Sequence, residues 1–510
     1  MRYANTRLAA RFIACCSLTS AAVVKIGTQP KQTITSFGAS GAWWPNDLIH
    51  FPEEVQENLT KLLFSEDGLH LSSYRYNVGG DGGNDTERVT TNGRAVESFL
   101  LRNGTYDWSR DSAGVKVLKA AQQYAVPYIT YFVNAAPSNI SDNGAACGWN
   151  MTAAKVPAFA DYLATVLSYW TDHGIDIKYI SPMNEPDNAR PNCEQEGMAV
   201  QPSLRSSVIK AIRSALDGSD AEAVDIIADE TSQVTTQAFP EDPVWLPSST
   251  PYMSNIAVHN YDYPSDSNLT IYYQSLVNIT DGHPPPVKYT ETCCSTRSGS
   301  GSDVFGAQYD PTMGNALIVG RYVWQFLTIV QAQSFDWWTA VSSGLPCSPA
   351  IDGASCATEL NNTSSAGYND GLIYIDPQYN TTKDYSLYLT KRAFMLKHFA
   401  TFHRPGSVRY DIAQSQLPDS VNAFASKSAA SPSTYGPGSG AQTWSVLFMN
   451  NQTAPYKFTL AAPKGAKLKQ LVQTTNEADW EVVQQLPVVR RGNVQLSLPA
   501  QSIVTVQFTA

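Results

Sequence analysis

The stretch ISPMNEP, residues 180–186, decides the fold, because a short apolar strand runs directly into a polar turn between two prolines. A second stretch of this kind, VKYTET, occupies residues 287–292. Each carries a glutamate at the end of its strand, Glu185 in the first and Glu291 in the second. Polar residues at the carboxyl ends of parallel strands are typical of the functional face of a barrel. The two stretches therefore predict two carboxyl groups on one face of a parallel sheet.

Short apolar runs alternate with amphipathic helical patterns from about residue 34 to residue 340, which indicates repeated βα units. We expect eight strands, at residues 34–38, 69–78, 127–134, 177–183, 224–228, 255–260, 287–291 and 334–338. Eight such units close into a (β/α)8 TIM barrel. Strands four and seven then face each other across the barrel mouth, so Glu185 and Glu291 are predicted to meet there.

The pattern changes after a predicted helix at about residues 385–399. Short alternating strands follow at 444–449, 457–460, 494–498 and 503–508, which indicates an antiparallel β-domain. Residues 425–442 are rich in Ser, Pro, Gly and Ala, and we expect a flexible loop there. The α/β chain is thus predicted to hold a catalytic barrel at 34–399 and an antiparallel β-sandwich side domain formed by 23–33 and 400–510.

Charge and motif content exclude several classes of protein. The chain has 510 residues, with 35 Lys and Arg against 45 Asp and Glu, and no basic stripe, so nucleic acid is not an expected partner. The glycine-rich segment 79–83 matches neither a phosphate loop nor a dinucleotide fingerprint, and no Gly-x-Ser-x-Gly elbow occurs. The seven His lack ligand spacing, so we expect no metal and no cofactor.

The N-terminus predicts export from the cell. Three arginines precede an apolar run at residues 12–24, which indicates a signal peptide over residues 1–22, although a buried N-terminal helix is an alternative. Eleven Asn-x-Ser/Thr sequons support export, at Asn58, Asn84, Asn103, Asn139, Asn150, Asn268, Asn278, Asn361, Asn362, Asn380 and Asn451. With no second apolar stretch of about 18 residues and no lipid-anchor tail, we expect a secreted extracellular protein without membrane contact.

Six of the eight cysteines lie beyond the predicted signal peptide: Cys147, Cys193, Cys293, Cys294, Cys347 and Cys356. An even number in an exported chain indicates disulfides, whose pairing the sequence does not fix. Cys347 with Cys356 is the simplest local pair. For the adjacent Cys293 and Cys294, disulfide bonding is a more natural fate than a reactive thiol.

Two facing carboxyl groups have a specific chemical use. Hydrolysis of a glycosidic bond with retention requires two carboxyl groups about 5–5.5 Å apart, one protonated and one ionised. A single glutamate among 45 acidic residues is most simply a surface charge, but two at matching strand ends favour catalysis. Glu185 and Glu291 are therefore our candidate catalytic residues.

Several motifs resemble glycoside hydrolase family 30, a family of retaining (β/α)8 enzymes. They are Asn-Glu-Pro at 184–186, the glutamate at 291 and His-x-Tyr at 259–261. Segments 36–48 and 72–80 are most similar to fungal endo-β-1,6-galactanases. The resemblance implies that Glu185 is the acid/base, that Glu291 is the nucleophile, and that Asn184 binds the sugar 2-hydroxyl beside the scissile bond. It also implies endo-hydrolysis of β-1,6-galactan in arabinogalactan side chains, by double displacement.

The resemblance assigns supporting roles to other residues. Arg75 and Tyr261 are similar to the pair that holds the nucleophile ionised, although a structural salt bridge is an alternative for Arg75. Glu185, which has no such cation in the resemblance, is expected to stay protonated. His259 is either a substrate or neighbouring contact or a buried core histidine. Many relatives carry an aromatic residue where Asn260 stands, which puts the local sugar contact in question.

Further candidates concern the sugar-binding surface. Glu230 ends strand five, where we expect a substrate contact, with an ordinary polar role as the alternative. Aromatic rings that could stack on a pyranose are supplied by Trp43, Trp149 and Trp337. Because Trp337 and Trp338 alternate along a strand, at most one of them can point into the barrel mouth.

Two other functions remain open from the sequence. The two glutamates do not identify the sugar, so a β-1,6-glucanase or another β-glycosidase on the same scaffold is the enzymatic alternative. A non-catalytic glycan-binding protein of the cell wall is the alternative from another class. In each case the partner is a polysaccharide or oligosaccharide, and we expect a monomer.

Overall fold

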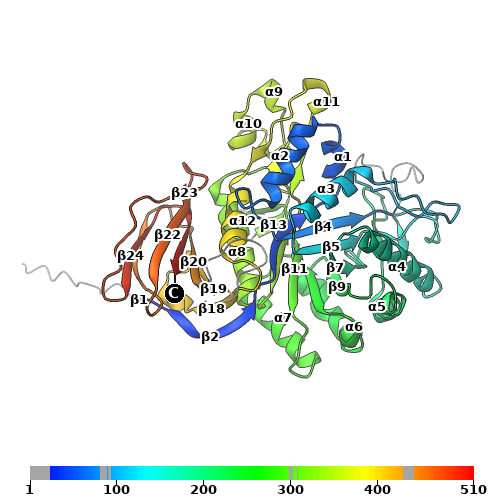
Figure 1. Cartoon of the computed structure of the whole chain (residues 1–510), viewed down its shortest axis with the longest axis horizontal. Helices are drawn as coiled ribbons and strands as arrows, with labels where there is room; N and C mark the ends of the chain where they lie inside the picture. The colour runs from blue at the N-terminus through cyan, green and yellow to red at the C-terminus, as the bar shows by residue number, and fades with distance from the viewer. Residues whose placement is uncertain are drawn as a thin grey trace, which may run out of the picture.

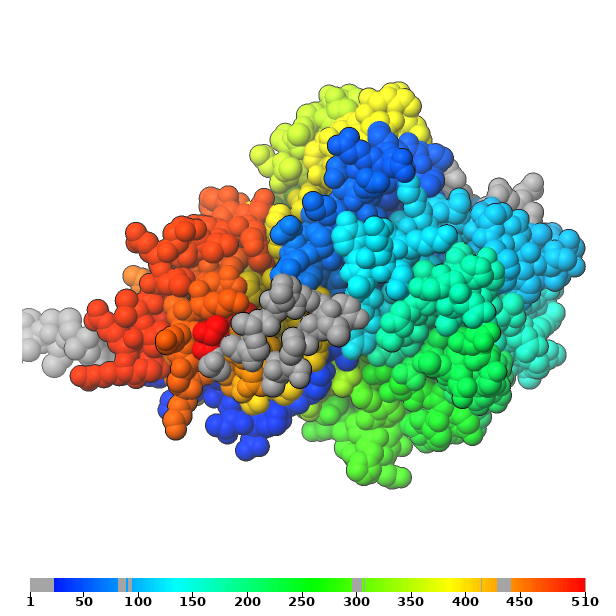
Figure 2. Space-filling view, in the orientation of Figure 1, coloured from blue at the N-terminus to red at the C-terminus, as the bar shows by residue number. Residues whose placement is uncertain are grey.

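The chain forms two lobes, a barrel surrounded by helices and a smaller β-domain that lies against it (Figure 1). The computed structural model describes residues 23–80, 89, 94–297, 303–306, 308–428 and 442–509. In the space-filling view the β-domain, largely orange to red, is a separate lobe beside the barrel (Figure 2). The predicted signal peptide at residues 1–22 lies outside the described residues.

Eight parallel strands close into a barrel, which confirms the predicted fold. In spatial order they are β3 (Ser36–Ser40), β4 (Ser73–Val78), β5 (Tyr128–Val133), β7 (Ile177–Ser181), β9 (Asp225–Thr231), β10 (Asn255–His259), β11 (Val287–Glu291) and β14 (Ser334–Trp337). β11 has the predicted bounds, and the others differ from prediction by a few residues at their ends. Since β14 is the fourth strand from β7 in either direction, it lies directly across the barrel from β7. Strand β11 is the third strand from β7, so the prediction that strands four and seven face each other directly is wrong by one strand.

Helices cover the outside of the barrel (Figure 1). The longer ones are α2 (Glu53–Phe64), α3 (Ser112–Gln123), α4 (Val156–Asp172), α5 (Pro202–Leu216), α6 (Phe239–Ser249), α7 (Asp266–Ile279), α8 (Met313–Thr328) and α12 (Lys391–Phe402). Helix α2 begins directly after Pro52, as the sequence predicts, with Glu53 and Glu54 in its first turn. In α4 the apolar residues at three- and four-residue spacing, among them Leu163 and Leu167, are buried against the barrel.

The β-domain consists of two sheets around a separate apolar core. The seven-stranded sheet is ordered β2 (Ile26–Thr33), β18 (Val408–Ile412), β19 (Val421–Lys427), β20 (Thr443–Asn450), β25 (Ser502–Thr509), β22 (Lys467–Thr474) and β23 (Glu481–Val482). The three-stranded sheet is ordered β1 (Val23–Val24), β21 (Tyr456–Ala461) and β24 (Asn493–Leu498). All pairs are antiparallel except β1 with β21, which is parallel. Phe448 and Phe458 pack between the sheets, so the core is that of a sandwich.

The predicted loop at 425–442 needs a correction. Residues 425–427 belong to β19, where they pair with residues 444–446 of β20, and residues 429–441 lie outside the described residues. Strand β2 falls within segment 23–33, which was assigned to this domain, but four further strands of the sheet, β18, β19, β22 and β23, had no counterpart in the sequence prediction. Their apolar runs are short and are interrupted by Asn, Ser, Lys and Gln, which weakens the period-two signal.

Helices α8 and α12 join the two lobes. Trp324 of α8 donates its indole N–H to the carbonyl of Ala423 at 2.8 Å. His398 of α12 lies 2.8 Å from Thr505 Oγ1 and 3.0 Å from Thr474 Oγ1, both in the β-domain. Burial lowers the pKa of His398 to about 3, so its ring is neutral and suited to both hydroxyl partners. Hydrogen bonds from both helices thus fix the β-domain to the barrel.

The part of the chain that the structure describes contains three disulfides: Cys147–Cys193, Cys293–Cys294 and Cys347–Cys356. The last is the predicted local pair, and the two adjacent cysteines are bonded to each other. Within the described residues, none of the helices combines the length and the apolar composition needed to cross a membrane.

Candidate active site

Five charged residues meet inside the mouth of the barrel, at the carboxyl ends of its strands. Glu291 ends β11, Arg75 lies on β4, Glu230 on β9 and His259 on β10, while Glu185 lies on the turn that follows β7. All five are buried. Irregular register on both sides of β10 accompanies this convergence, because a bulge redirects a side chain. The two predicted stretches therefore meet as the barrel topology requires.

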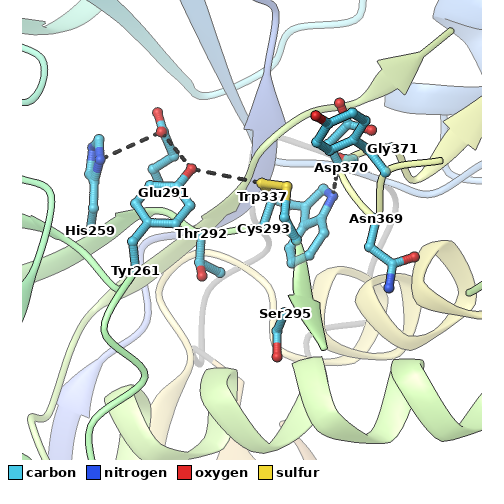
Figure 3. The surroundings of a disulfide bond; sticks show 12 residues. His259, Tyr261, Glu291, Thr292, Cys293, Ser295, Trp337, Asn369, Asp370 and Gly371 are labelled. Carbon is cyan, nitrogen blue, oxygen red and sulfur yellow. Dashed lines mark hydrogen bonds and ion pairs between the residues drawn. A yellow bond between two sulfur atoms is a disulfide. The ribbon is translucent and has the colours of Figure 1, made fainter. Parts of the chain in front are cut away.

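Glu291 is held by a cation and a hydroxyl. Arg75 Nη1 lies 2.9 Å from Glu291 Oε2, and Tyr261 donates its hydroxyl to Oε1 at 2.8 Å. Both contacts expected from the resemblance are present. Figure 3 shows Tyr261 directed at Glu291, with His259 on the other side of the same carboxylate. Charge-assisted bonds to both oxygens stabilise the carboxylate and fix its orientation.

Arg75 serves two carboxylates at once. Its Nη2 lies 3.0 Å from both oxygens of Glu230 and 3.4 Å from Asn184 Oδ1. Burial by itself would lower the pKa of Arg75, but Glu230 and Glu291 outweigh it and raise the pKa above its ordinary value. The guanidinium also lies over the Phe132 ring, 4.3 Å from its centroid. Arg75 is therefore a permanent, rigidly placed cation.

Glu230 does not occupy the position predicted for a substrate contact. Its side chain is fully buried, and both of its oxygens accept from Arg75. With no exposed surface and with both oxygens bonded to Arg75, this carboxylate leaves no open approach for a sugar hydroxyl. Glu230 is instead the second counter-charge of Arg75.

His259 connects the carboxylates. Its Nδ1 lies 3.4 Å from Glu185 Oε1 and 3.5 Å from Glu291 Oε1, and its Nε2 lies 3.9 Å from Glu230 Oε2. Burial would lower the pKa of His259, but Glu291, Glu185 and Glu230 together raise it. Of the two predicted roles, the neighbouring contact fits, because the buried ring touches both candidate catalytic carboxylates. The ring is a buried link between these two groups, and the carboxylates around it favour its protonated form.

Glu185 differs from its predicted state. No cation was expected beside it from the resemblance, but the Arg190 guanidinium contacts Glu185 Oε2 directly. Burial raises the pKa of Glu185, and Arg190 together with His259 reverses the effect, so that the pKa lies below its usual range. Arg190 is the only basic residue among 186–200, and its place five residues after Glu185 was the available signal. A prediction made from strand patterns does not show that the turn after β7 brings Arg190 back to Glu185.

The separation of the two carboxylates suits one class of chemistry. One oxygen of Glu185, one of Glu291 and one nitrogen of His259 all lie within 4.8 Å of one another. That spacing fits direct attack by one carboxylate, whereas an inverting enzyme needs about 6.5–9.5 Å to admit a water. Three such groups could also hold a metal ion, but here a guanidinium already contacts each carboxylate, which opposes a further cation.

A large cavity adjoins this cluster on the side of β3 and β14. It has a volume of about 1190 Å³, and its lining includes Trp43, Trp338, Asp47, Arg94 and Asp370 but neither Glu185 nor Glu291. The link to the cluster is short, because the backbone N–H of Trp338 donates to the carbonyl of the residue after Glu291 at 3.1 Å. Trp338 thus connects the cavity with the residue after Glu291, and the cavity lining comes from segments that follow β3, β4 and β14, with none from the turn after β7.

The predicted aromatic residues divide into two groups. Trp43 lines the cavity and meets Trp338 edge to face, with ring centroids 5.0 Å apart. Trp337, which was expected at the site, is instead buried and donates its indole N–H to the carbonyl of Asp370. Trp338 is thus the member of the alternating pair that reaches the cavity. Trp149 is buried in a short strand, β6 (Trp149–Asn150), and is not part of the cavity lining.

The disulfide between adjacent cysteines lies directly behind Tyr261. Cys293 Sγ is 4.0 Å from the Tyr261 hydroxyl, and the hydroxyl of Tyr263 donates to the Cys293 carbonyl. Figure 3 shows Tyr261 between this disulfide and Glu291. Asn260 points away from the site, since its amide donates to the Tyr289 hydroxyl at 3.0 Å. The Asn260 amide N–H is therefore engaged by a hydrogen bond within the barrel.

A pair of close carboxylates with unequal partners, at the carboxyl face of a (β/α)8 barrel beside an aromatic cavity, defines a glycosidase. Comparison with protein families agrees, since residues 21–345 match the model of O-glycosyl hydrolase family 30. The chain belongs to that family. Among curated proteins, none matches the chain.

Solved structures share the whole architecture at low sequence identity. A conserved exported protein from Bacteroides fragilis is 20% identical with a TM-score of 0.73, covering 95% of this chain and 100% of its own. The catalytic domain of a family 30 xylanase C from Talaromyces cellulolyticus is 18% identical with a TM-score of 0.67, covering 96% and 100%. An endo-β-1,6-glucanase is 14% identical with a TM-score of 0.64, covering 96% and 95%. At these identities the likeness concerns the fold.

Proposed function

We propose that this protein is a secreted retaining endo-glycoside hydrolase that cleaves β-1,6-galactosidic bonds in galactan or arabinogalactan side chains. The observation that carries the mechanism is the pair Glu185 and Glu291, with carboxylate oxygens within 4.8 Å and different partners. The three disulfides are compatible with an extracellular location.

In the first step Glu291 attacks the anomeric carbon while Glu185 donates its proton to the departing glycosidic oxygen. A bond forms between Glu291 and the sugar, the glycosidic bond breaks, and the aglycone leaves with the proton. In the second step Glu185, now ionised, removes a proton from water as the water attacks the same carbon. Glu291 departs as a carboxylate, Glu185 regains its proton, and the product keeps the β configuration.

The surrounding residues would support this cycle. Arg75 and Tyr261 hold the two oxygens of Glu291, which limits its rotation and aligns one oxygen for attack. Asn184 lies beside Arg75, with Oδ1 at 3.4 Å, so its amide N–H₂ remains for a sugar hydroxyl. His259 lies between the two carboxylates and reduces their repulsion. These residues orient and stabilise the groups that react.

The cavity supports a polymeric substrate. The acid has to lie beside the leaving aglycone, so the aglycone belongs on the β7 side and the sugars that stay with Glu291 belong opposite it. The 1190 Å³ cavity lies on that opposite side, with Trp43 and Trp338 available for stacking against pyranose rings. Room for more than one sugar beyond the nucleophile favours cleavage within a chain.

The linkage and sugar rest on the resemblance of residues 36–48 and 72–80 to fungal endo-β-1,6-galactanases. A β-1,6-glucanase is the second candidate, because one structural neighbour is an endo-β-1,6-glucanase with the same architecture. A glycan-binding protein without turnover is a weaker candidate, because Glu185, Glu291 and Arg75 are all present and in contact with suitable partners.

The proposal is tested by incubating the secreted protein with de-arabinosylated β-1,6-galactan and, separately, with β-1,6-glucan. We expect short β-1,6-galacto-oligosaccharides from the first, with the β anomer formed first in the NMR spectrum. Release from the glucan alone would replace the sugar but keep the mechanism. An α anomer formed first would overturn retention, and binding without hydrolysis of any β-glycan would replace the enzyme with a binding protein.

A further inference from the structure

Arg190 is the one charged residue in contact with a candidate catalytic group that the double-displacement scheme leaves without a role. Its guanidinium contacts Glu185 Oε2, and its side chain keeps 21% of its surface exposed. Arg75, the cation of Glu291, is by contrast fully buried. One carboxylate thus has a cation enclosed in the barrel, and the other has a cation that reaches it from a surface loop.

The loop that carries Arg190 is fixed at several points. The disulfide Cys147–Cys193 ties it to the segment after β5, and the N–H of Gly148 donates to the Ala189 carbonyl at 2.7 Å. Asn188 Oδ1 accepts from the backbone N–H of Arg190 at 2.9 Å. The aliphatic part of Arg190 packs over Gly197, where an added Cβ would come within 2.3 Å of it. Gly197 therefore leaves the space through which Arg190 reaches Glu185.

An acid/base has opposite requirements in the two steps. Protonated Glu185 is needed for departure of the leaving group, and ionised Glu185 is needed to activate water. A guanidinium in contact favours the ionised form and opposes the protonated one. Its effect is therefore unfavourable in the first step and favourable in the second.

We propose that Arg190 is a positioning residue that sets the protonation of Glu185, favouring its role as general base in the second step and confining its role as acid to lower pH. This inference rests on the proposed retaining function. In this view Arg190 helps to set the relative rates of the two steps. The two glutamates alone do not set them.

The other charged groups around Glu185 do not replace Arg190. His259 approaches the opposite oxygen, Oε1, and is shared with Glu291 and Glu230. Arg75 is occupied by those same two carboxylates. Asp187, on the same loop, and Tyr261, beside Glu291, carry no positive charge. Among the described residues, Arg190 alone places a cation on Oε2.

The kinetic test uses R190Q and R190M, both uncharged, with E194Q as the matched control. Glu194 Oε1 lies 3.9 Å from Arg190 Nη1, so E194Q alters the same neighbourhood without removing the cation. The substrates are the polysaccharide and the 2,4-dinitrophenyl glycoside of the sugar that the wild type releases from it. On the alkaline side, we expect the pH at which kcat/KM falls to rise by about one unit or more in R190Q and R190M. It should not change in E194Q.

The two steps provide a second readout. With the dinitrophenyl leaving group the first step needs little acid assistance, so kcat reports the second step. We expect kcat on this substrate to fall by about tenfold in R190Q while kcat/KM changes little, because water activation loses the ion pair that favours the base. If Arg190 were only structural, its replacement would change kcat and kcat/KM on both substrates. The alkaline limb of the pH profile would then stay at the same pH.

A direct titration separates this inference from the proposed function. The ¹³Cδ resonance of Glu185, identified by its loss in E185Q, is followed against pH in glutamate-labelled wild type and R190Q. A higher midpoint in R190Q supports the inference, even if wild type hydrolyses no glycan tested and the proposed function fails. An unchanged midpoint and alkaline limb would overturn it, as would failure of both uncharged variants to fold, since Arg190 would then be structural.

Discussion

Glu291 and Glu185 carry the same carboxyl group on two sides of one cluster. They are held in place by different kinds of backbone element. Glu291 ends a barrel strand, and its cation Arg75 comes from another strand of the same closed sheet. Glu185 lies on a turn with φ +47°, and its cation Arg190 comes from the loop that follows. The nucleophile is thus set by the barrel and the acid/base by a loop.

The difference has a chemical reason. A nucleophile needs one constant state, an oriented carboxylate, and rigid strands deliver that state. An acid/base gains and loses a proton in each turnover, so the cation beside it affects the two steps in opposite ways. That cation is a partly exposed arginine on a disulfide-tied loop, whereas the cation of the nucleophile is buried between two carboxylates. The following changes test this contrast.

The largest expected effect is that of E291Q. Without a nucleophilic oxygen no glycosyl-enzyme forms, so we expect kcat/KM to fall by more than about 10⁴-fold on every substrate, including activated aryl glycosides. Steady-state kinetics on both substrate types measures it. Residual turnover within about 100-fold of wild type would place the nucleophile elsewhere.

E185Q is expected to discriminate between leaving groups. General acid assistance contributes about 10²- to 10⁴-fold, so we expect a loss of that size in kcat/KM on the polysaccharide. On the dinitrophenyl glycoside, which departs without a proton, kcat/KM should change little, although kcat should fall because the base is also missing. Equal losses of kcat/KM on both substrates would contradict the assignment of Glu185 as the acid.

Y261F removes the hydroxyl on Glu291 and leaves Arg75 in place. A hydrogen bond to a charged group is worth about 1.5–3 kcal/mol, which corresponds to a loss of roughly 10- to 10²-fold in kcat/KM. Y263F is the matched control, because Tyr263 has the same side chain but donates to the Cys293 carbonyl instead of Glu291. If Y263F proves as damaging as Y261F, the effect belongs to the packing around the disulfide and not to Glu291.

The smallest expected effect is a displacement of the pH profile when both cysteines of the Cys147–Cys193 pair become serine. Activity needs protonated Glu185 and falls as pH rises through its pKa, which Arg190 lowers. Loosening the Arg190 loop raises that pKa, so the alkaline limb should move to higher pH, by less than in R190Q. The control replaces Cys347 and Cys356 with serine. Their disulfide has a sequence separation of 9 and lies outside the Arg190 loop, so its loss should leave the alkaline limb of the pH profile unchanged.

Much of the fold was predictable because its signals are local. An apolar strand with a polar end recurs eight times, and the barrel topology then brings the ends of β7 and β11 together at the mouth. The pairing of Cys347 with Cys356 was accessible for the same reason, since only nine residues separate them. Strands β18, β19 and β22 were missed because their apolar alternation is broken by polar residues.

The sequence by itself determined the barrel, the two glutamates at its mouth and, through its resemblance, Arg75 and Tyr261 as partners of Glu291. Only the tertiary structure decided that Glu230 forms an ion pair with Arg75, that Trp338 and not Trp337 reaches the cavity, and that Arg190 contacts Glu185. Strand order follows from a repeated local pattern. The direction of a side chain and the charge it meets depend on turns, bulges and a disulfide that join residues distant in the chain.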